Sequence, residues 1–130
     1  MTTQNAELIR RAYDAFADGD LTTVLKILDQ DITWHIPGRG PLAGDYKGHD
    51  EVMGFVTKTM ELSAGTFTID IDDILVDGDH VVVLCTVAAE RHGQCWSSPE
   101  VHVWRVINNS AVDFREFQGD QETEDEFWSS

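Results

Sequence analysis

Three side chains in the last third of the sequence could move protons: the imidazole of His102 and the carboxylates of Glu116 and Asp120. An imidazole with a pKa of about 6.5 can donate a hydrogen bond to an oxyanion or shuttle a proton at neutral pH. A carboxylate beside apolar walls has a raised pKa, which makes it a better base near neutrality. If they share one pocket, these groups predict acid-base chemistry on a small molecule.

Alternation along the predicted strands decides which of these side chains can meet, because residues two apart on a strand point to the same face. His102 shares a face with Trp104. Glu116 shares a face with Phe114, whereas Arg115 points to the opposite side. If the Glu116 side chain points into an apolar interior, its carboxylate must be protonated, paired or functional, and Arg115 cannot be assumed to neutralise it.

Structural interpretations of the same residues stay open. A histidine on a strand is often bonded to a neighbouring backbone or side chain, so His102 has a purely structural alternative. A carboxylate at a strand end is often a solvated turn residue or a cap, and the acidic residues around Asp120 favour that alternative.

The composition favours one compact, acidic unit. With 130 residues and 42% hydrophobic content, the chain can bury one sizeable core. Its formal charge of −15 repels phosphate backbones and anionic membrane surfaces, so we expect neither nucleic acid nor a membrane as partner. The first residues lack the charged-then-apolar order of a signal peptide, and no stretch approaches the roughly 20 apolar residues of a membrane span. We therefore expect a cytoplasmic protein.

The two cysteines carry no metal or disulfide pattern. Cys85 and Cys95 lie neither in a C-x-x-C pair nor beside histidines at ligand spacing. We expect both to be reduced, and we expect no metal site.

Hydrophobic periodicity predicts helices first and mainly strands afterwards. Apolar residues recur at three- and four-residue steps in three segments, which are 5–16, 20–28 and 49–62. Alternation of period two predicts five strands, which are 31–36, 66–76, 80–91, 95–107 and 111–118. A long Gly-rich turn separates the first strand from the third helix. This order predicts an α+β domain with a mostly antiparallel sheet and the helices on one face.

The turns and the tail complete this prediction. Asp77-Gly78-Asp79 and Asn108-Asn109-Ser110 are predicted hairpin turns, because Asn, Asp and Gly tolerate positive φ. The acidic tail 120–126 is followed by Phe127 and Trp128. We expect these aromatic side chains to dock the tail on the domain.

Several short motifs follow one another in an order that is moderately specific as a set. They are Tyr13-Asp-Ala-Phe16 with Gly19-Asp20, Trp34-His-Ile-Pro-Gly38, Pro41-Leu-Ala-Gly44, Tyr46-Lys-Gly48, Val101-His-Val-Trp-Arg105 and Phe114-Arg-Glu-Phe117. With the order of elements, they resemble the nuclear transport factor 2-like superfamily, in particular its SnoaL-like and ketosteroid isomerase-like branch. The resemblance implies a single domain over residues 1–130. It also implies a cone-shaped half-barrel, usually a homodimer, packed on the three N-terminal helices and enclosing a deep pocket that needs no metal or organic cofactor.

The resemblance also implies which residues face the pocket. Matched to ketosteroid isomerases, His102 takes the place of a carboxylic acid that donates a hydrogen bond to the developing oxyanion. SnoaL-like cyclases are similar in pairing a strand histidine with an acidic residue near the end of the last strand, which here is Asp120 at the pocket rim. The proton-shuttling aspartate of ketosteroid isomerases is replaced by Ile36. The side chains expected to contact the ligand are Tyr13, Trp34, Ile36, Phe55, Met60, Trp104, Phe114 and Gln118.

These observations lead to one main functional hypothesis and three alternatives. The main one is a cofactor-independent cyclase, isomerase or dehydratase that acts on a small, mostly apolar, oxygenated molecule. The alternatives are a non-catalytic ligand carrier, a dimeric interaction module, and an epoxide hydrolase, which lacks a convincing Asp-Arg-Asp set here. We expect a homodimer through the outer sheet face, where Val101, Val103 and Phe117 would be exposed.

Overall fold

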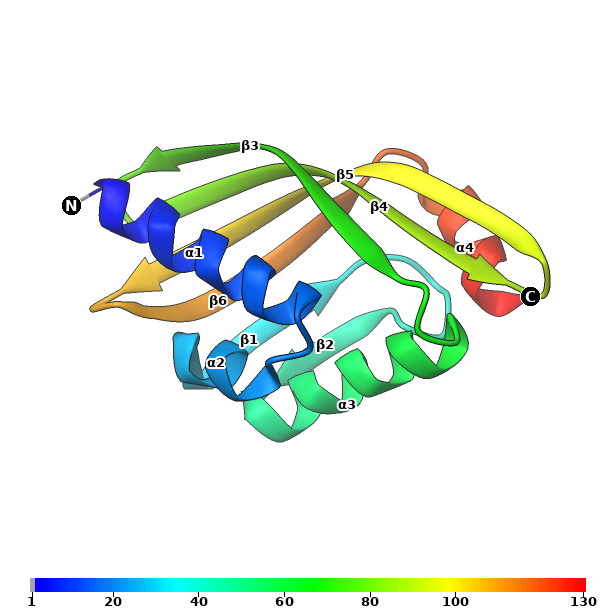
Figure 1. Cartoon of the computed structure of the whole chain (residues 1–130), viewed down its shortest axis with the longest axis horizontal. Coiled ribbons are helices and arrows are strands. Elements are labelled where there is room, and N and C mark those ends of the chain that lie inside the picture. Colours follow the sequence, from blue (N-terminus) through cyan, green and yellow to red (C-terminus); the bar gives the residue numbers. More distant parts are fainter. Residues whose placement is uncertain (1) are drawn as a thin grey trace.

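A computed structural model describes residues 2–130 and contains four helices and one six-stranded sheet (Figure 1). The helices are α1 (Thr2–Ala17), α2 (Leu21–Ile27), α3 (Gly48–Leu62) and α4 (Gln121–Ser129). Asp20 caps α2 by accepting a hydrogen bond from the Thr23 backbone N–H at 3.1 Å. The three predicted helices are therefore confirmed, with small shifts at their ends, and α4 is an addition to them.

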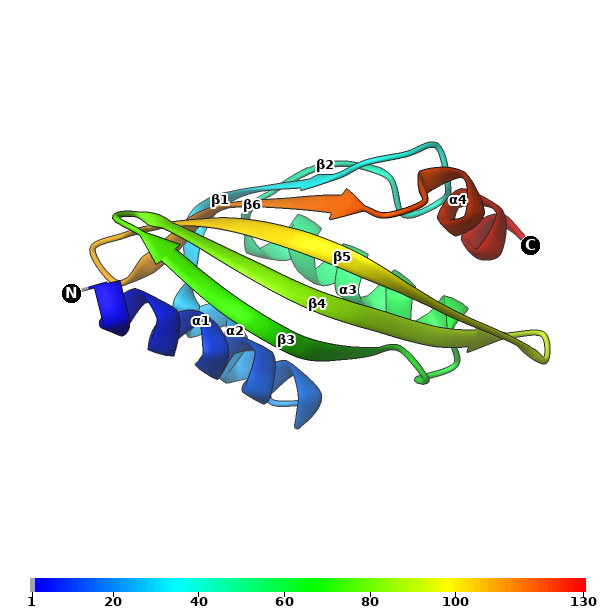
Figure 2. The same ribbon diagram turned by 90° about the horizontal axis from the view of Figure 1, so that it is seen from above.

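The sheet contains β1 (Leu28–Ile36), β2 (Gly44–Lys47), β3 (Thr68–Asp77), β4 (His80–Arg91), β5 (Gln94–Ile107) and β6 (Ser110–Gln118). Its strand order is β2-β1-β6-β5-β4-β3, and every neighbouring pair is antiparallel except β1 and β6. The sheet curves over α1, α2 and α3, while α4 lies at the end of the sheet away from the amino terminus (Figures 1 and 2). The predicted α+β half-barrel is confirmed.

Strand β2 was not predicted from the sequence. The Gly-rich segment between the first strand and the third helix was predicted to be a turn, but four of its residues pair with β1, with Tyr46 opposite Trp34 and Gly44 opposite Ile36. Gly44 has φ 143°, which L side chains rarely adopt, so the residue that suggested a turn also lets the chain enter this short edge strand. The hairpin turn at 108–110 is confirmed by positive φ angles at Asn108 and Asn109.

Alternation separates an inner and an outer face of the sheet. On β5 every second residue from Trp96 to Val106 is buried, whereas the residues between them are partly or fully exposed. The inner face and the helices thus share one core, to which α1 contributes Ile9 and Tyr13. Among the described residues, no helix is both long and apolar enough to cross a membrane. The single domain and the cytoplasmic location stay predictions.

The acidic tail is held on the domain by aromatic packing, as expected. Phe127 stacks on Trp96 of β5, with ring centroids 5.1 Å apart, and Trp128 meets the same indole edge-on at 6.0 Å. The guanidinium of Arg91 donates a hydrogen bond to the Trp128 carbonyl at 3.0 Å. Helix α4 therefore closes one end of the half-barrel.

Replacing Trp128 by alanine tests how much this closure contributes to stability. We expect the free energy of unfolding to fall by about 3–5 kcal/mol, because a large buried indole is removed and a cavity remains. Urea denaturation followed by circular dichroism measures the change. The matched control is Glu126→Ala, an exposed position on the same helix, whose effect should stay within about 0.5 kcal/mol. Equal effects of the two substitutions would show that α4 is not part of the folded core.

Candidate functional site

Strand register brings the polar residues of the inner face together. In the antiparallel pair of β5 and β6, His102 lies opposite Glu116 and Glu100 lies opposite Gln118. One step further along, Trp104 lies opposite Phe114. Directly opposite side chains on one face are close enough to touch. The predicted inward orientation of these β5 and β6 residues is confirmed.

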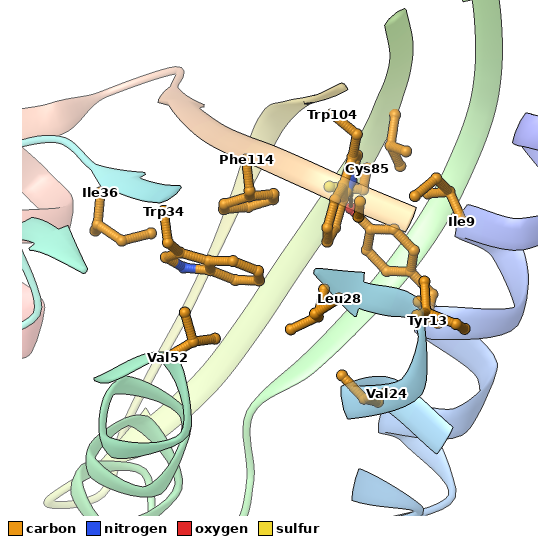
Figure 3. Packing of buried hydrophobic residues seen from close by; sticks show 14 of the residues in the cluster. Ile9, Tyr13, Val24, Leu28, Trp34, Ile36, Val52, Cys85, Trp104 and Phe114 are labelled. Atoms are coloured by element: carbon orange, nitrogen blue, oxygen red, sulfur yellow. Dashed lines mark hydrogen bonds between the residues drawn. The ribbon is translucent and has the colours of Figure 1, made fainter. Parts of the chain in front are cut away.

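His102 is the centre of a buried hydrogen-bonded chain. Its side chain lies under the sheet with 3% of the residue exposed. The Tyr13 hydroxyl lies 2.5 Å from Nδ1, and Glu100 Oε1 lies 2.8 Å from Nε2. The same hydroxyl accepts a hydrogen bond from the Trp104 indole N–H at 3.0 Å. Figure 3 shows Tyr13 reaching from α1 toward Trp104.

Burial keeps the imidazole of His102 neutral, and its hydrogen bonds select the tautomer. Burial lowers the pKa of His102 to about 4, with the Glu116 charge opposing that shift, so the ring is neutral at physiological pH. The Tyr13 hydroxyl oxygen accepts a hydrogen bond from the Trp104 indole N–H, so its own O–H donates to His102 Nδ1. The His102 Nε2–H then donates to Glu100. Both ring nitrogens thus have partners inside the protein, Tyr13 on one side and Glu100 on the other.

Glu100 and Glu116 form a carboxyl pair joined by Gln118. The Gln118 amide nitrogen donates to Glu100 Oε2 and, at 2.7 Å, to Glu116 Oε2. Burial raises the pKa of Glu100 to about 7, and Gln118 partly offsets this. Burial and the neighbouring Glu100 charge raise the pKa of Glu116 to about 8. Near neutral pH the pair therefore holds a transferable proton.

Glu124, from α4, completes a cluster of three carboxyl groups. One ligand oxygen from each of Glu100, Glu116 and Glu124 lies within 4.8 Å of the others. Burial, followed by the charges of Glu116 and Glu100, raises the pKa of Glu124 to about 10. A second close set, Cys85, Glu100 and His102, is poorly suited to a metal: the imidazole is fully hydrogen-bonded, and burial raises the pKa of the Cys85 thiol to about 12.

Two adjoining cavities lie beside this network. The larger, of about 90 Å³, lies between the helices and the inner sheet face, and its lining is almost wholly apolar. The smaller, of about 20 Å³, lies toward α4 and is lined by all three clustered carboxyl residues. Phe55, Thr59, Phe67 and Glu116 line both cavities. Glu116 is thus the carboxyl residue at their junction.

Most of the residues expected to contact a ligand surround these cavities. Those lining the larger one are Tyr13, Trp34, Phe55, His102, Trp104, Phe114 and Glu116. Figure 3 shows Trp34 beside Phe114, with its indole nitrogen on the ring edge that faces Val52 of α3. Ile36 lines the smaller cavity, and Gln118 is hydrogen-bonded to the carboxyl pair.

Three of the expected site residues line neither cavity: Met60, Gln118 and Asp120. Met60 lines neither cavity, although Met53, Val56 and Thr59 of the same helix line the larger one. Asp120 lies outside both cavities: its carboxylate is exposed and caps α4, accepting bonds from the Thr123 N–H at 3.1 Å and hydroxyl at 2.7 Å. These bonds lower the pKa of Asp120, where a raised value was expected.

Glu100 and Glu124 were not predicted from the sequence as site residues. Glu100 could have been found, since it lies two residues before His102 on the same strand face. Glu124 shares a helix face with Phe127 and Trp128 at three- and four-residue spacing, a signal that is visible only once the tail is treated as a helix.

The outer face holds a separate polar group. His35 contacts Asp45 at 2.8 Å and Asp113 at 3.2 Å, and Arg115 pairs with Asp113 at 3.5 Å. The outward direction predicted for Arg115 is confirmed. Arg115 is therefore not available to neutralise Glu116 or to form the Asp-Arg-Asp set of an epoxide hydrolase.

The carboxyl pair should make stability depend on pH. The pKa of Glu116 rises from an ordinary value of 4.5 to about 8 on folding, so its stabilising contribution is complete below pH 4.5 and is lost as pH rises toward 8. We expect the wild-type free energy of unfolding to decline between about pH 5 and 8. Glu116→Gln should make the decline shallower by up to about 1.4 kcal/mol per pH unit.

Urea unfolding at several pH values measures this difference, with Glu126→Gln as a control that leaves the slope unchanged. A Glu116→Gln slope equal to that of the wild type would mean that Glu116 is ionised in the folded protein at all these pH values.

Similarity in sequence and structure to known proteins identifies the family of this chain. Residues 9–114 match the SnoaL-like domain. An uncharacterized Mycobacterium tuberculosis protein, Rv0034, is 29% identical over 124 residues, 95% of each chain. Bal32a, from a soil-derived mobile gene cassette, is 34% identical with a TM-score of 0.94 over 98% of each chain. A nuclear transport factor 2-like protein of unknown function from Burkholderia pseudomallei is 30% identical with a TM-score of 0.88, again over 98% of each chain. The chain belongs to the SnoaL-like domain family.

Proposed function

We propose that this protein binds a small, mostly apolar, oxygenated organic molecule in the larger cavity and transfers protons to and from it through Glu116. The observation that carries the proposal is the position of Glu116. It lines an apolar cavity and is hydrogen-bonded through Gln118 to a second carboxyl group, Glu100. A proton-exchanging pair whose pKa values lie near neutrality is suited to general acid-base catalysis.

An unpartnered donor supports an oxygen on the ligand. The indole nitrogen of Trp34 is buried and has no hydrogen-bond partner among the described residues, and Trp34 lines the larger cavity. A buried N–H without an acceptor is costly, and a carbonyl or ether oxygen of the ligand would satisfy it. The apolar lining would hold the rest of the molecule.

The proposed chemistry needs only the carboxyl pair. Protonated Glu116 gives its proton to a carbonyl oxygen or a departing hydroxyl group of the ligand. In its ionised form it removes a proton from carbon, and Glu100 exchanges the proton with it through their close contact. His102 and Tyr13 hold Glu100 in place. Such proton transfers belong to isomerases, dehydratases and ring-closing enzymes.

A ligand carrier without catalysis is the second candidate. It is favoured by the closed hydrogen bonding of Tyr13 and His102, whose polar atoms already have partners inside the protein. In a carrier, the carboxyl pair would only orient the bound molecule.

Proton exchange on a simple cyclic ketone separates these candidates. With 2-tetralone in D₂O, we expect the wild-type protein to speed exchange of the α-protons, measured by NMR. Glu116→Gln should slow the protein-dependent rate by about 100-fold or more, because the acid-base group is lost. The control Glu126→Gln should keep the wild-type rate. Full exchange activity in Glu116→Gln would refute the proposed role of Glu116, while 2-tetralone that quenches tryptophan fluorescence yet stays unexchanged would favour a carrier.

We also propose a homodimer through the outer face of the sheet. Phe117 is 52% exposed there, and Val101 lies directly opposite it on β5. Apolar side chains gathered on an outer face usually mark an interface.

Sedimentation velocity at micromolar concentration tests the dimer. We expect the wild type and Phe117→Leu to sediment as dimers and Phe117→Glu as a monomer, because a buried unpaired carboxylate at the interface is costly. A monomeric wild type would contradict the proposal.

A further inference from the structure

We propose that the ligand of this protein is a small primary amine whose ammonium group occupies the smaller cavity, between Glu100, Glu116 and Glu124, while its apolar body fills the larger one. This inference rests on the proposed function, namely that the two cavities hold a small organic molecule, and it names the chemical class of that molecule.

The first observation is an acceptor without a partner. Glu124 is 5% exposed and lines the smaller cavity, and its Oε2 atom is buried without a hydrogen bond to any described residue. Leaving a carboxyl oxygen unpaired in an apolar interior is costly. A ligand that donates hydrogen bonds at this point removes the cost.

The second observation is that, among the described side chains, only negative charges act on Glu124. The charges that act on Glu124 come from Glu116, Glu100 and Asp125. The nearby guanidinium of Arg91 is directed to the carbonyls of Trp128 and Ser130, at the end of α4. A cationic group entering the cavity would be the charge partner that these carboxyl groups lack.

The third observation is the match of sizes. A space of about 20 Å³ is enough for one water molecule, and an ammonium group is of similar size. Trp96 and Trp128 also line this space, and aromatic faces attract cations. The shared walls at Phe55, Thr59, Phe67 and Glu116 lead to the apolar cavity, so the body attached to the ammonium group would lie there.

A divalent metal ion fits the same place less well. Such an ion needs about six oxygen ligands, whereas the adjoining cavity is apolar. In addition, the nitrogen of the Gln118 amide, which is a donor, bridges Glu100 and Glu116. An ammonium group needs only the three acceptors that its hydrogens reach.

Protons take the place of the cation when the site is empty. The titratable groups facing the cluster are Glu100, Glu116 and Glu124 themselves, with His102, Cys85, Tyr13 and Asp125 around them. Burial raises the pKa values of all three clustered carboxyl groups. An incoming ammonium group would lower them again, so amine binding should release protons.

Calorimetric titration of the full-length protein at pH 7.5 tests the inference with two probes of equal shape, 2-phenylethylamine and 2-phenylethanol. We expect the amine to bind with a Kd at least about tenfold lower, because charge-assisted hydrogen bonds are stronger than neutral ones. Repeating the titration in buffers with different ionisation enthalpies should reveal proton release with the amine and none with the alcohol.

Substitution of Glu124 locates the effect. Glu124→Gln and Glu124→Leu should both abolish the preference for the amine while 2-phenylethanol still binds, and thermal melts check that both variants fold. The matched control Glu126→Gln, on the exposed side of the same helix, should keep the preference. A preference that survives in both Glu124 variants would place the ammonium group elsewhere and overturn the inference.

The remaining outcomes separate this inference from the proposed function. Equal affinity of amine and alcohol would overturn the amine inference and leave the proposed function intact, as would binding of 2-tetralone without binding of the amine. Binding of Mg²⁺ or Ca²⁺ alone that is lost in Glu124→Gln would replace the amine with a metal ion. Failure of all three organic probes to bind would overturn both.

Discussion

Polar groups buried inside an apolar half-barrel impose the strongest constraint on this structure. A chain of hydrogen bonds runs from the Trp104 indole through Tyr13, His102 and Glu100 to Gln118. Each buried polar atom in it costs free energy unless its partner is in place. These hydrogen bonds join α1, β5 and β6, so the register of β5 and β6 and the position of α1 depend on one another.

Helix α4 extends the same constraint to the end of the barrel. Its aromatic residues Phe127 and Trp128 pack on Trp96, and this docking carries Glu124 into the interior, because residues three and four apart lie on one helix face. The packing of α4 therefore both closes the end of the half-barrel and adds a third carboxyl group to the site. The Asp120 side chain caps the first turn of α4, and this start of the helix places Glu124 on its buried face.

Local pattern was sufficient for five of the six described strands, and insufficient for the edge strand β2 and for contacts between distant elements. Alternation put His102 with Trp104 and Glu116 with Phe114, because a strand that is buried on one side alternates, and the family resemblance identified that face as the inner one. The same resemblance placed Asp120 at the pocket rim, but the chain turns after Gln118 and Asp120 caps α4 instead. The contact between Tyr13 and His102 joins residues 89 positions apart, and no local pattern encodes it.

Four buried side-chain atoms lack a hydrogen-bond partner among the described residues, and two of them belong to residues that line the cavities. Trp34, which lines the larger cavity, carries an unpartnered donor, and Glu124, which lines the smaller one, carries an unpartnered acceptor. The fold carries the cost of both in its empty state, so a ligand that matches them gains affinity without desolvating either group anew. A molecule turned end to end would meet a donor with a donor and an acceptor with an acceptor. In the proposed function, this pair would therefore set the orientation of the ligand relative to Glu116, and with it the atom that exchanges a proton.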